Sequence, residues 1–363
     1  MTEIDLLKRV RDDVPAPDPL ALARARQRLF TPPPVRRRVT RARLLVAGGL
    51  ALTLAGGFLA ADVVGHESSP LPGTVADAST FLANAAALAK ANPDTPVPPG
   101  QYLLVSTEYG RLYEFGPGKK YRATVHTKVD EWIPADPTQR RHPQRIQGPT
   151  KVDFANAQAE AAARKYAPDL FQRPKPHLYS ANCHGLVIQP NLSAEVLNRP
   201  CIPSWRLPTP EFLARQPRDP DALLAALRNA KPPQDQRGRW EMPADQQAFG
   251  LIARVLDSGI APADLRAALY EAAAKIPGIV LTNDVVTLDG RHGRAIGFDF
   301  TEYQRSEIVI SPVDGQAIGS RTVTLPAGAA VDKANQSGNT RPGDIEIATS
   351  VATRISPTAP RIK

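Results

Sequence analysis

PADLRAALYEAAAKIPGIVLTNDVVTLDG, residues 262–290, contains a complete helix signal followed directly by a strand signal. Pro262 suits the first position of a helix, and Pro277 with Gly278 ends one. Between them the apolar side chains recur at helical spacing, at Leu265, Ala268, Leu269, Ala272 and Ile276. The sequence therefore predicts a helix over 262–276 and a change to strand from Ile279.

The C-terminal side of this stretch continues as strands. Asp289-Gly290 and Asp314-Gly315 are turn signals between short apolar and β-branched runs, which predicts an antiparallel meander. Residues 332–344 are polar and rich in glycine, so we expect a loop there. The expected strands cover residues 279–288, 295–301, 307–311, 317–325 and 345–355.

The N-terminal side adds further helices and strands. Thr74 and Asp77 resemble a helix cap, and Asn92-Pro93 ends that helix. The expected helices are 74–91, 153–166, 219–229 and 244–257, and the expected strands are 101–108, 120–127 and 129–133. This order of helix, strands, helices and strands predicts an α+β domain over 74–363, with helices packed on an antiparallel sheet.

The net charge of +9 is concentrated at one end of the chain. Residues 1–43 hold eleven Lys or Arg and five Asp or Glu, and the remaining residues are close to neutral. A nucleic-acid-binding domain would spread basic residues over a face, so we expect no nucleic-acid partner.

An apolar run adjoins this basic segment. LLVAGGLALTLAGGFLAA at 44–61 carries no charge, and residues 44–64 as a helix would span roughly 31 Å, the thickness of a bilayer core. Five arginines precede it, whereas no Lys or Arg follows it until Lys90. These flanking arginines are Arg36, Arg37, Arg38, Arg41 and Arg43.

This pattern predicts one transmembrane helix. The positive-inside rule places residues 1–43 in the cytoplasm as a basic tail, and places the 65–73 linker and the large domain outside it, in a cell-membrane protein. One alternative is a signal peptide cleaved near Ala55 and Gly57, although 43 residues is a long preceding region. A buried helix of a soluble protein is the other.

Small residues form a stripe on the predicted span. Gly49, Thr53 and Gly57 recur every four residues, where a second helix can approach closely. The stripe predicts a homodimer through the membrane helix. The alternative is that small residues are simply common in such spans.

The chain contains two cysteines, Cys183 and Cys201, both on the predicted outer side. Linking them would close a loop in a proline-rich stretch, with a stabilisation of about 3 kcal/mol. We expect a structural disulfide. A metal site of Cys183, His184 and Cys201 is the competing interpretation, and it lacks a fourth nearby ligand.

Motifs of enzyme chemistry are absent from the sequence: there is no HExxH, GxSxG elbow, Walker A loop or GxGxxG. Carboxylate pairs such as Asp130-Glu131 and Glu302 with Glu307 are interpreted as solvated strand edges. We therefore expect no catalytic residues, no cofactor and no metal. The aromatic side chains either fill the core or line a ligand groove: Trp132, Trp205, Trp240, Tyr102, Tyr109, Tyr113 and Tyr121.

The tail is more apolar than orientation alone requires. Two short helices are expected, over about 2–13 and 18–30, and they would be marginal in isolation. Such helices can fold on the surface of a partner. Their apolar residues are Ile4, Leu6, Leu7, Val10, Leu20, Leu22 and Leu29.

Four stretches carry a resemblance to a known family: EIDLLKRVRDDVPAPDP at 3–19, PPGQYLLVSTEYG at 98–110, LRAALYEAAAKIPGI at 265–279 and SPVDGQAIG at 311–319. With the arginine-flanked span, they resemble actinobacterial single-pass membrane proteins of uncharacterised function, often encoded beside extracytoplasmic-function sigma factors. The resemblance implies a regulator acting with a sigma factor, and an outer domain similar to the open half-barrel of periplasmic sensors.

One departure from related regulators is visible. Zinc-containing anti-sigma domains carry a His and two Cys before the membrane, and residues 1–43 contain neither residue type. Sigma binding would therefore be zinc-free. The alternative to regulation is a passive, membrane-anchored domain that binds an extracytoplasmic ligand or has a structural role.

Overall fold

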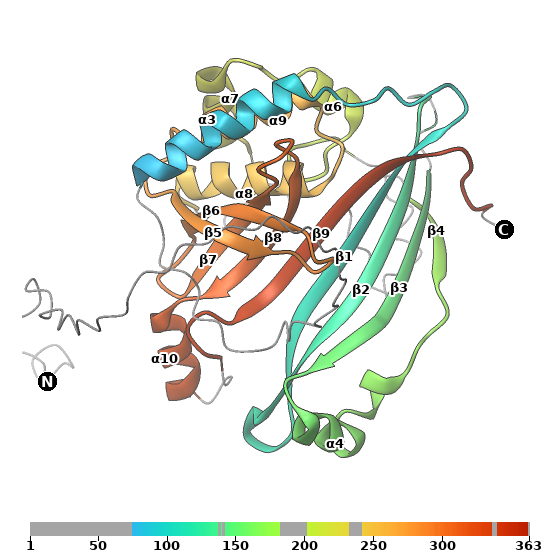
Figure 1. Ribbon diagram of the computed structural model, residues 1–363, viewed down its shortest axis with the longest axis vertical. Helices are drawn as coiled ribbons and strands as arrows, with labels where there is room; N and C mark the ends of the chain where they lie inside the picture. The colour runs from blue at the N-terminus through green and yellow to red at the C-terminus, as the bar shows by residue number, and fades with distance from the viewer. Residues whose placement is uncertain are drawn as a thin grey trace, which may run out of the picture. The chain divides into compact units, whose positions relative to one another are not determined.

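A computed structural model describes residues 75–136, 139, 142–181, 202–231, 242–335 and 340–361 (Figure 1). The helices are α3 (Val75–Ala91), α4 (Ala157–Tyr166), α6 (Pro210–Ala214), α7 (Pro220–Arg228), α8 (Ala244–Asp257), α9 (Ala263–Ala273) and α10 (Pro326–Asn335), with 3₁₀ turns η1 (Pro117–Lys119) and η2 (Pro168–Phe171). The strands are β1 (Tyr102–Phe115), β2 (Tyr121–Pro134), β3 (His142–Phe154), β4 (His177–Ala181), β5 (Val280–Val286), β6 (His292–Asp299), β7 (Gln304–Ile310), β8 (Ala317–Thr324) and β9 (Ile345–Ser356).

These strands form one open antiparallel sheet of nine strands, in the order β4-β3-β2-β1-β9-β8-β7-β6-β5. Two meanders, β1–β4 and β5–β8, occupy its two halves. The last strand, β9, lies between them and pairs with β1 on one side and β8 on the other. The final segment of the described chain thus joins the two halves into a single sheet.

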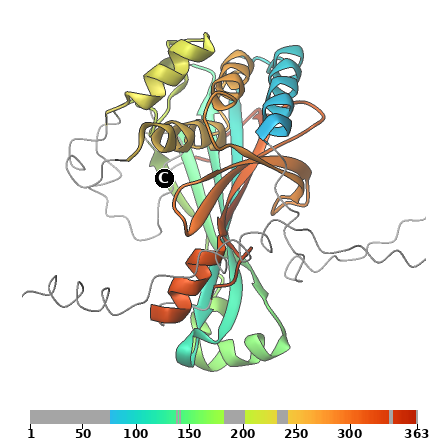
Figure 2. The same cartoon turned by 90° about the vertical axis from the view of Figure 1, so that its left-hand side faces the viewer.

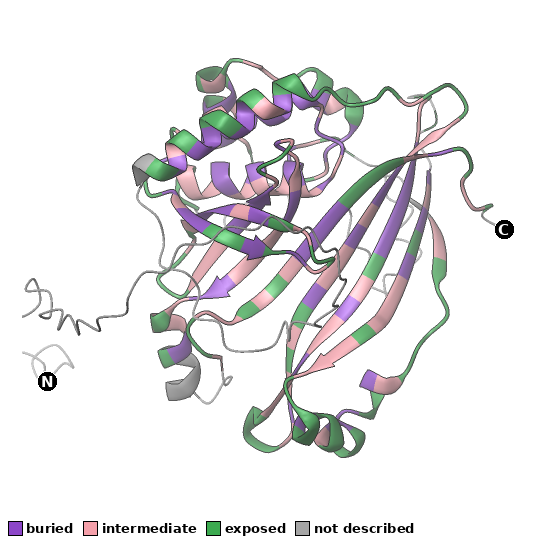
Figure 3. Cartoon of the chain, in the orientation of Figure 1, coloured by how far each residue is buried: buried purple, intermediate pink, exposed green. Residues whose placement is uncertain are grey.

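Helices α3, α7, α8 and α9 pack together and cover one face of the β5–β8 half. Their inward sides form the main core with apolar residues of that sheet face, such as Ile296 and Ile308. The buried residues, coloured purple in Figure 3, are frequent in these helices and on the strands that they cover. Tyr270 of α9 is fully buried, and its hydroxyl donates to the Gly315 carbonyl at 2.9 Å, which links the helical layer to the β7–β8 turn.

The far end of the long strands carries a second, smaller cluster. Helix α4 packs on β2 and β3 there, with Ala159 and Ala163 facing Phe115 and Ala123. Figure 2 shows the four packed helices at one end of the sheet and α4 at the other.

The predicted α+β class is confirmed, with an open antiparallel sheet and several helices. The C-terminal meander was predicted strand by strand, and the helices predicted at 74–91, 219–229 and 244–257 correspond to α3, α7 and α8. The expected loop at 332–344 is wrong in part, because α10 extends to Asn335. The two strands expected at 120–127 and 129–133 are one strand, β2.

Strand β3 was missed, because its two prolines argue against a strand. The register of β2 and β3 shifts between His126 and Lys128, opposite the Gly148–Thr150 segment that contains Pro149. A proline is tolerated at such a bulge, since the ladder is already interrupted there. The helix expected from Asp153 begins later, because Asp153 and Phe154 belong to β3 and Asn156 caps α4.

Several predicted features lie outside the described residues. They are the tail, the arginine flank, the span at 44–64 with Gly49, Thr53 and Gly57, the 65–73 linker, both cysteines and Trp240. Among the helices of the described ranges, none has the length and apolar character needed to cross a bilayer.

Candidate functional site

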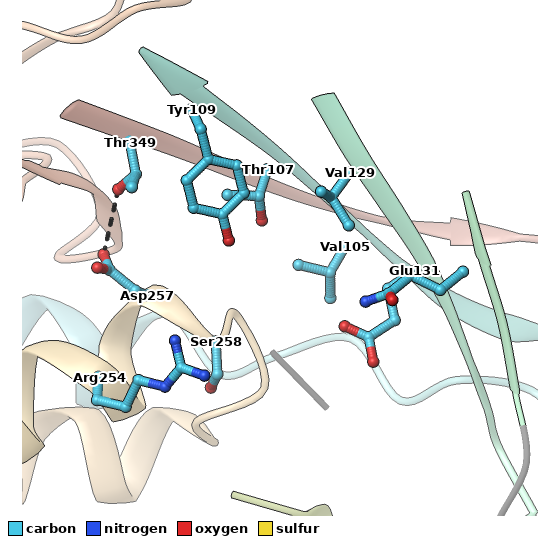
Figure 4. Close-up of a pocket in the computed structure, with 10 residues that line it drawn as sticks. Val105, Thr107, Tyr109, Val129, Glu131, Arg254, Asp257, Ser258 and Thr349 are labelled. Carbon is cyan, nitrogen blue, oxygen red and sulfur yellow. Dashed lines mark hydrogen bonds between the residues drawn. The ribbon is translucent and has the colours of Figure 1, made fainter. Parts of the chain in front are cut away.

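A cavity of about 40 Å³ lies where the C-terminal end of α8 meets the sheet (Figure 4). It is enclosed between α8 on one side and four neighbouring strands, β3, β2, β1 and β9, on the other. Most of its polar groups can carry charge or donate hydrogen bonds. The lining residues are Val105, Thr107, Tyr109, Val129, Glu131, Gln144, Arg254, Asp257, Ser258 and Thr349.

Strand geometry explains why these residues converge. Alternate residues of a strand point to one face, so Val105, Thr107 and Tyr109 of β1 share the side that faces α8. The register then places Glu131 beside Val105, and Gln144 beside Glu131. Side chains from three strands thus gather over one small area of the sheet.

Asp257 is the last residue of α8, and its carboxylate faces this area. Ser320 Oγ donates to its Oδ2 at 2.6 Å, and Thr349 Oγ1 lies 3.5 Å from its Oδ1. Burial of the carboxyl raises the pKa of Asp257 to about 6, although the two hydroxyls and the Arg254 charge act in the opposite direction. A carboxylate at the C-terminus of a helix is also disfavoured by the helix dipole.

Tyr109 brings a phenol to the same cavity. Figure 4 shows its hydroxyl pointing into the space between Asp257 and Glu131, with the Arg254 guanidinium on the α8 side. Burial, and next the neighbouring Asp257 carboxylate, raise the pKa of Tyr109 above its ordinary value. The phenol is therefore neutral at physiological pH and able to donate a hydrogen bond.

Glu131, on the opposite wall of the cavity, is paired with a histidine. The His142 Nε2 atom contacts Glu131 Oε1, and both residues are buried, with exposed fractions of 1% and 4%. Such a pair is costly to form in the interior unless its members hold one another, so removing one partner would leave the other uncompensated. The cavity thus has an acidic group on each side.

The cavity volume limits its occupants. A water molecule needs roughly 10–15 Å³ of such space, so about three waters fit and an organic substrate does not. Within the described ranges, no three His, Cys, Asp or Glu side chains lie close enough together to hold a metal ion. The arrangement is suited to exchanging protons with enclosed water as Asp257 titrates.

The interpretation of the carboxylate pairs as solvated edges is wrong for Asp130, Glu131 and Glu307, whereas Glu302 is exposed as expected. Asp130 and Glu131 are buried on opposite faces of β2, where Asp130 accepts from Ser106 Oγ at 2.6 Å and contacts Arg145. Glu307 is also buried and accepts from Thr282 Oγ1 and Arg321 Nε. Charged residues at alternate positions of a strand were the only sequence signal for buried carboxylates. The basic and hydroxyl side chains that pair with them lie on other strands, so local sequence does not show the pairing.

The aromatic side chains do not line a common groove among the described residues. Trp132 and Trp205 are buried, and Trp205 belongs to the main core. Tyr121 stacks against Tyr166 near α4, whereas Tyr109 alone of the predicted set lines the cavity. Asp257, Arg254 and His142 each look like an ordinary surface residue in the local sequence pattern, so the sequence gives no signal that they belong to a site.

Comparison with known proteins gives no assignment: no family model, no curated protein and no solved structure matches this chain. The functional conclusion therefore rests on the residues themselves.

Proposed function

We propose that this chain is a single-pass membrane regulator whose outer α+β domain senses conditions in the cell envelope and whose tail contacts a cytoplasmic sigma factor. The observation that carries the sensing part is the ionisable seam between α8 and the sheet, defined here as Asp257, Tyr109, Glu131 and Arg254. Because burial raises the pKa of Asp257 to about 6, its charge would change when the pH outside the cell falls from neutral to mildly acidic.

The seam lies where a change in the charge of Asp257 can alter the packing of the helices on the sheet. Asp257 ends α8, and its partners Ser320 and Thr349 lie on β8 and β9. Strand β9 joins the two halves of the sheet. Ionisation of Asp257 therefore acts on the contact between the helical layer and the strand that holds the halves together, which is the kind of two-state element a switch requires.

The signalling part is supported by the sequence. The apolar run at 44–64, the arginines before it and the apolar side chains of residues 1–31 fit a cytoplasmic tail that folds on a partner. The stripe of Gly49, Thr53 and Gly57 fits self-association of the span. The open sheet is compatible with the half-barrel of sensor domains, which we include in the proposal as fold analogy.

The test uses the full chain in its native host, with a transcriptional reporter for the neighbouring sigma factor. Deletion of residues 1–35 is expected to change reporter output severalfold. Leu7→Asp and Leu22→Asp should each reproduce part of that effect, because they place a charge on the predicted binding face. An unchanged reporter in all three strains would favour the passive, anchored domain.

The sensing part has its own matched pair of variants. Shifting external pH from 7 to 5 should change the reporter, and Asp257→Asn should remove that response. Asp284→Asn is the control, since its side chain is 82% exposed and lies on β5, away from the seam. A pH response that survives in Asp257→Asn would contradict the role of this carboxyl.

A further inference from the structure

Strand β9 is longer than its partner β8, and this leaves part of one edge open. Strand β8 pairs with residues 345–350 of β9, whereas β1 pairs with residues 347–356 on the other side. Residues 351–356 therefore have no strand partner on the β8 side within the described part of the chain. Ala352, Thr353 and Arg354 are exposed.

One side-chain contact shows which residues of β9 point their backbone N–H and C=O groups toward this open edge. Arg291 Nη2 donates to the Val351 carbonyl at 2.7 Å and to the Ile318 carbonyl at 3.3 Å, so it bridges the point where β8 ends. In an antiparallel strand the N–H and C=O of alternate residues point to the same side. Thr353 and Ile355 therefore present their backbone groups along the open edge beyond Val351.

A hollow of about 500 Å³ lies beside this edge. The α8–α9 connection, the β7–β8 turn and the start of β6 form its walls, and Val313 on its rim is 80% exposed. The hollow is lined by both polar and apolar groups, and it offers room for side chains next to unpaired backbone groups. The lining residues include Leu256, Ala261, Ala317, Ile318, Val351 and Thr353.

One cationic side chain of the hollow has unused hydrogen-bonding capacity. Arg266, Arg291, His292 and Asp314 line the hollow, and Arg291 and His292 are already paired with Asp289 and Asp284. Arg266 is only 5% exposed, and its Nη1 atom holds Asp94 and the Ala261 carbonyl. Its Nε and Nη2 atoms have no hydrogen-bond partner among the described residues. Buried guanidinium nitrogens without acceptors are uncommon, and a nearby anionic group would offset their charge.

We propose that an extended peptide segment bearing an acidic side chain adds as a strand to residues 351–356 of β9, with that side chain over the hollow. Free backbone groups select an extended peptide, because only a strand can pair with them repeatedly. The two Arg266 nitrogens without acceptors in the described part of the chain select the acidic residue. This partner site is separate from the seam around Asp257. The proposal of peptide binding does not depend on whether the tail contacts a sigma factor.

The test selects random octapeptides displayed on phage against the purified full-length chain, followed by binding of the synthesised consensus peptide. We expect a consensus with alternating β-branched residues and at least one Asp or Glu. Methylation of alternate backbone nitrogens on the pairing edge of the peptide should abolish binding, since it blocks strand pairing. Replacing the acidic residue by its amide should weaken binding about fivefold.

Variants of the chain locate the site. Thr353→Pro removes one N–H from the open edge and should weaken binding at least fivefold, whereas Thr353→Val keeps that N–H and should bind normally. If Thr353→Pro does not fold, the exposed Val313 supplies a second pair: Val313→Glu should weaken binding and Val313→Lys should strengthen it. No enriched peptide, or a peptide indifferent to backbone methylation and to these variants, would overturn the proposal.

Discussion

The two halves of the sheet bury different kinds of side chain. The β5–β8 half lies under a layer of helices, and its covered face is apolar, as in Leu281, Ile296 and Ile308. The β1–β3 region is built from strands of 13 or 14 residues and buries many polar groups. Those buried groups include His126, Asp130, Glu131, His142 and Gln144.

This difference indicates a division of roles. Apolar burial supplies most of the free energy of folding, so stability is expected to be concentrated in the helical layer and the β5–β8 half. Buried ionisable pairs add little net stability and respond to pH and to nearby charge. The β1–β3 region and its seam with α8 are therefore where a functional response is expected.

The largest expected effect tests the apolar half. Leu269→Ala in α9 removes a side chain with no exposure from the main core, and should lower the free energy of unfolding by about 2–5 kcal/mol. Ile347→Ala in β9, at 43% exposure, is the control and should cost much less. Denaturant unfolding measures both. Equal losses of stability in the two variants would contradict the idea that stability is concentrated in the helix-covered core.

The next effect tests the seam. Because burial raises the pKa of Asp257 from 3.8 to about 6, the folded state binds this proton more tightly than the unfolded chain does. Stability from this group is therefore full below about pH 4, is lost as the pH rises to about 6, and stays constant above that. Asp257→Asn should remove this dependence and raise the free energy of unfolding at pH 7.5 by roughly 1–3 kcal/mol.

Thermal unfolding at pH 4 and pH 7.5 gives the measurement for Asp257→Asn. The difference between the two melting temperatures should shrink in the variant, relative to the unmodified chain and to Asp284→Asn. A variant whose pH dependence is unchanged would assign the titration to another group, and the seam would lose its main support.

A comparable effect concerns how the meander is attached to the helices. Gly290 and Gly315 both have positive φ in Asp-Gly turns, but a Cβ on Gly315 would lie 2.5 Å from the Ala85 carbonyl of α3, whereas one on Gly290 meets nothing within 4 Å. Gly290→Ala should cost about 1 kcal/mol from backbone strain, and Gly315→Ala should cost roughly 1–3 kcal/mol more from overpacking. Chemical denaturation gives the free energy of unfolding of both variants, and the difference between them isolates the cost of packing a Cβ at Gly315 against α3.

The smallest effect is expected at the far end of the long strands. Glu160 and Arg164 form an ion pair on α4 at 3.5 Å, with side-chain exposures of 50% and 67%. Glu160→Gln should change stability by less than about 0.5 kcal/mol, because water screens exposed pairs. A loss above about 1 kcal/mol in urea unfolding would show that α4 contributes more to stability than its small cluster suggests.

Sequence patterns predicted the parts of the fold whose signals are local. Pro262 caps the start of α9, which ends at Ala273, a few residues before Pro277-Gly278, and Asp289-Gly290 and Asp314-Gly315 separate strands of the meander. Strand β3 and the cavity could not be predicted in the same way. Pro149 is tolerated there because of a bulge that depends on the register with β2, and Asp257 depends on hydroxyls from β8 and β9.

Local sequence signals were sufficient to predict the α+β class, the main helices and the antiparallel meander, because helix caps, turn residues and apolar periodicity act over a few residues. It also carries the prediction of a membrane span and an inward basic tail. By contrast, the insertion of β9 between β1 and β8 is visible only in the folded chain, as is the cavity that Asp257, Tyr109 and Glu131 share. Pairing between segments from opposite ends of the described chain depends on register and packing, which local periodicity does not encode.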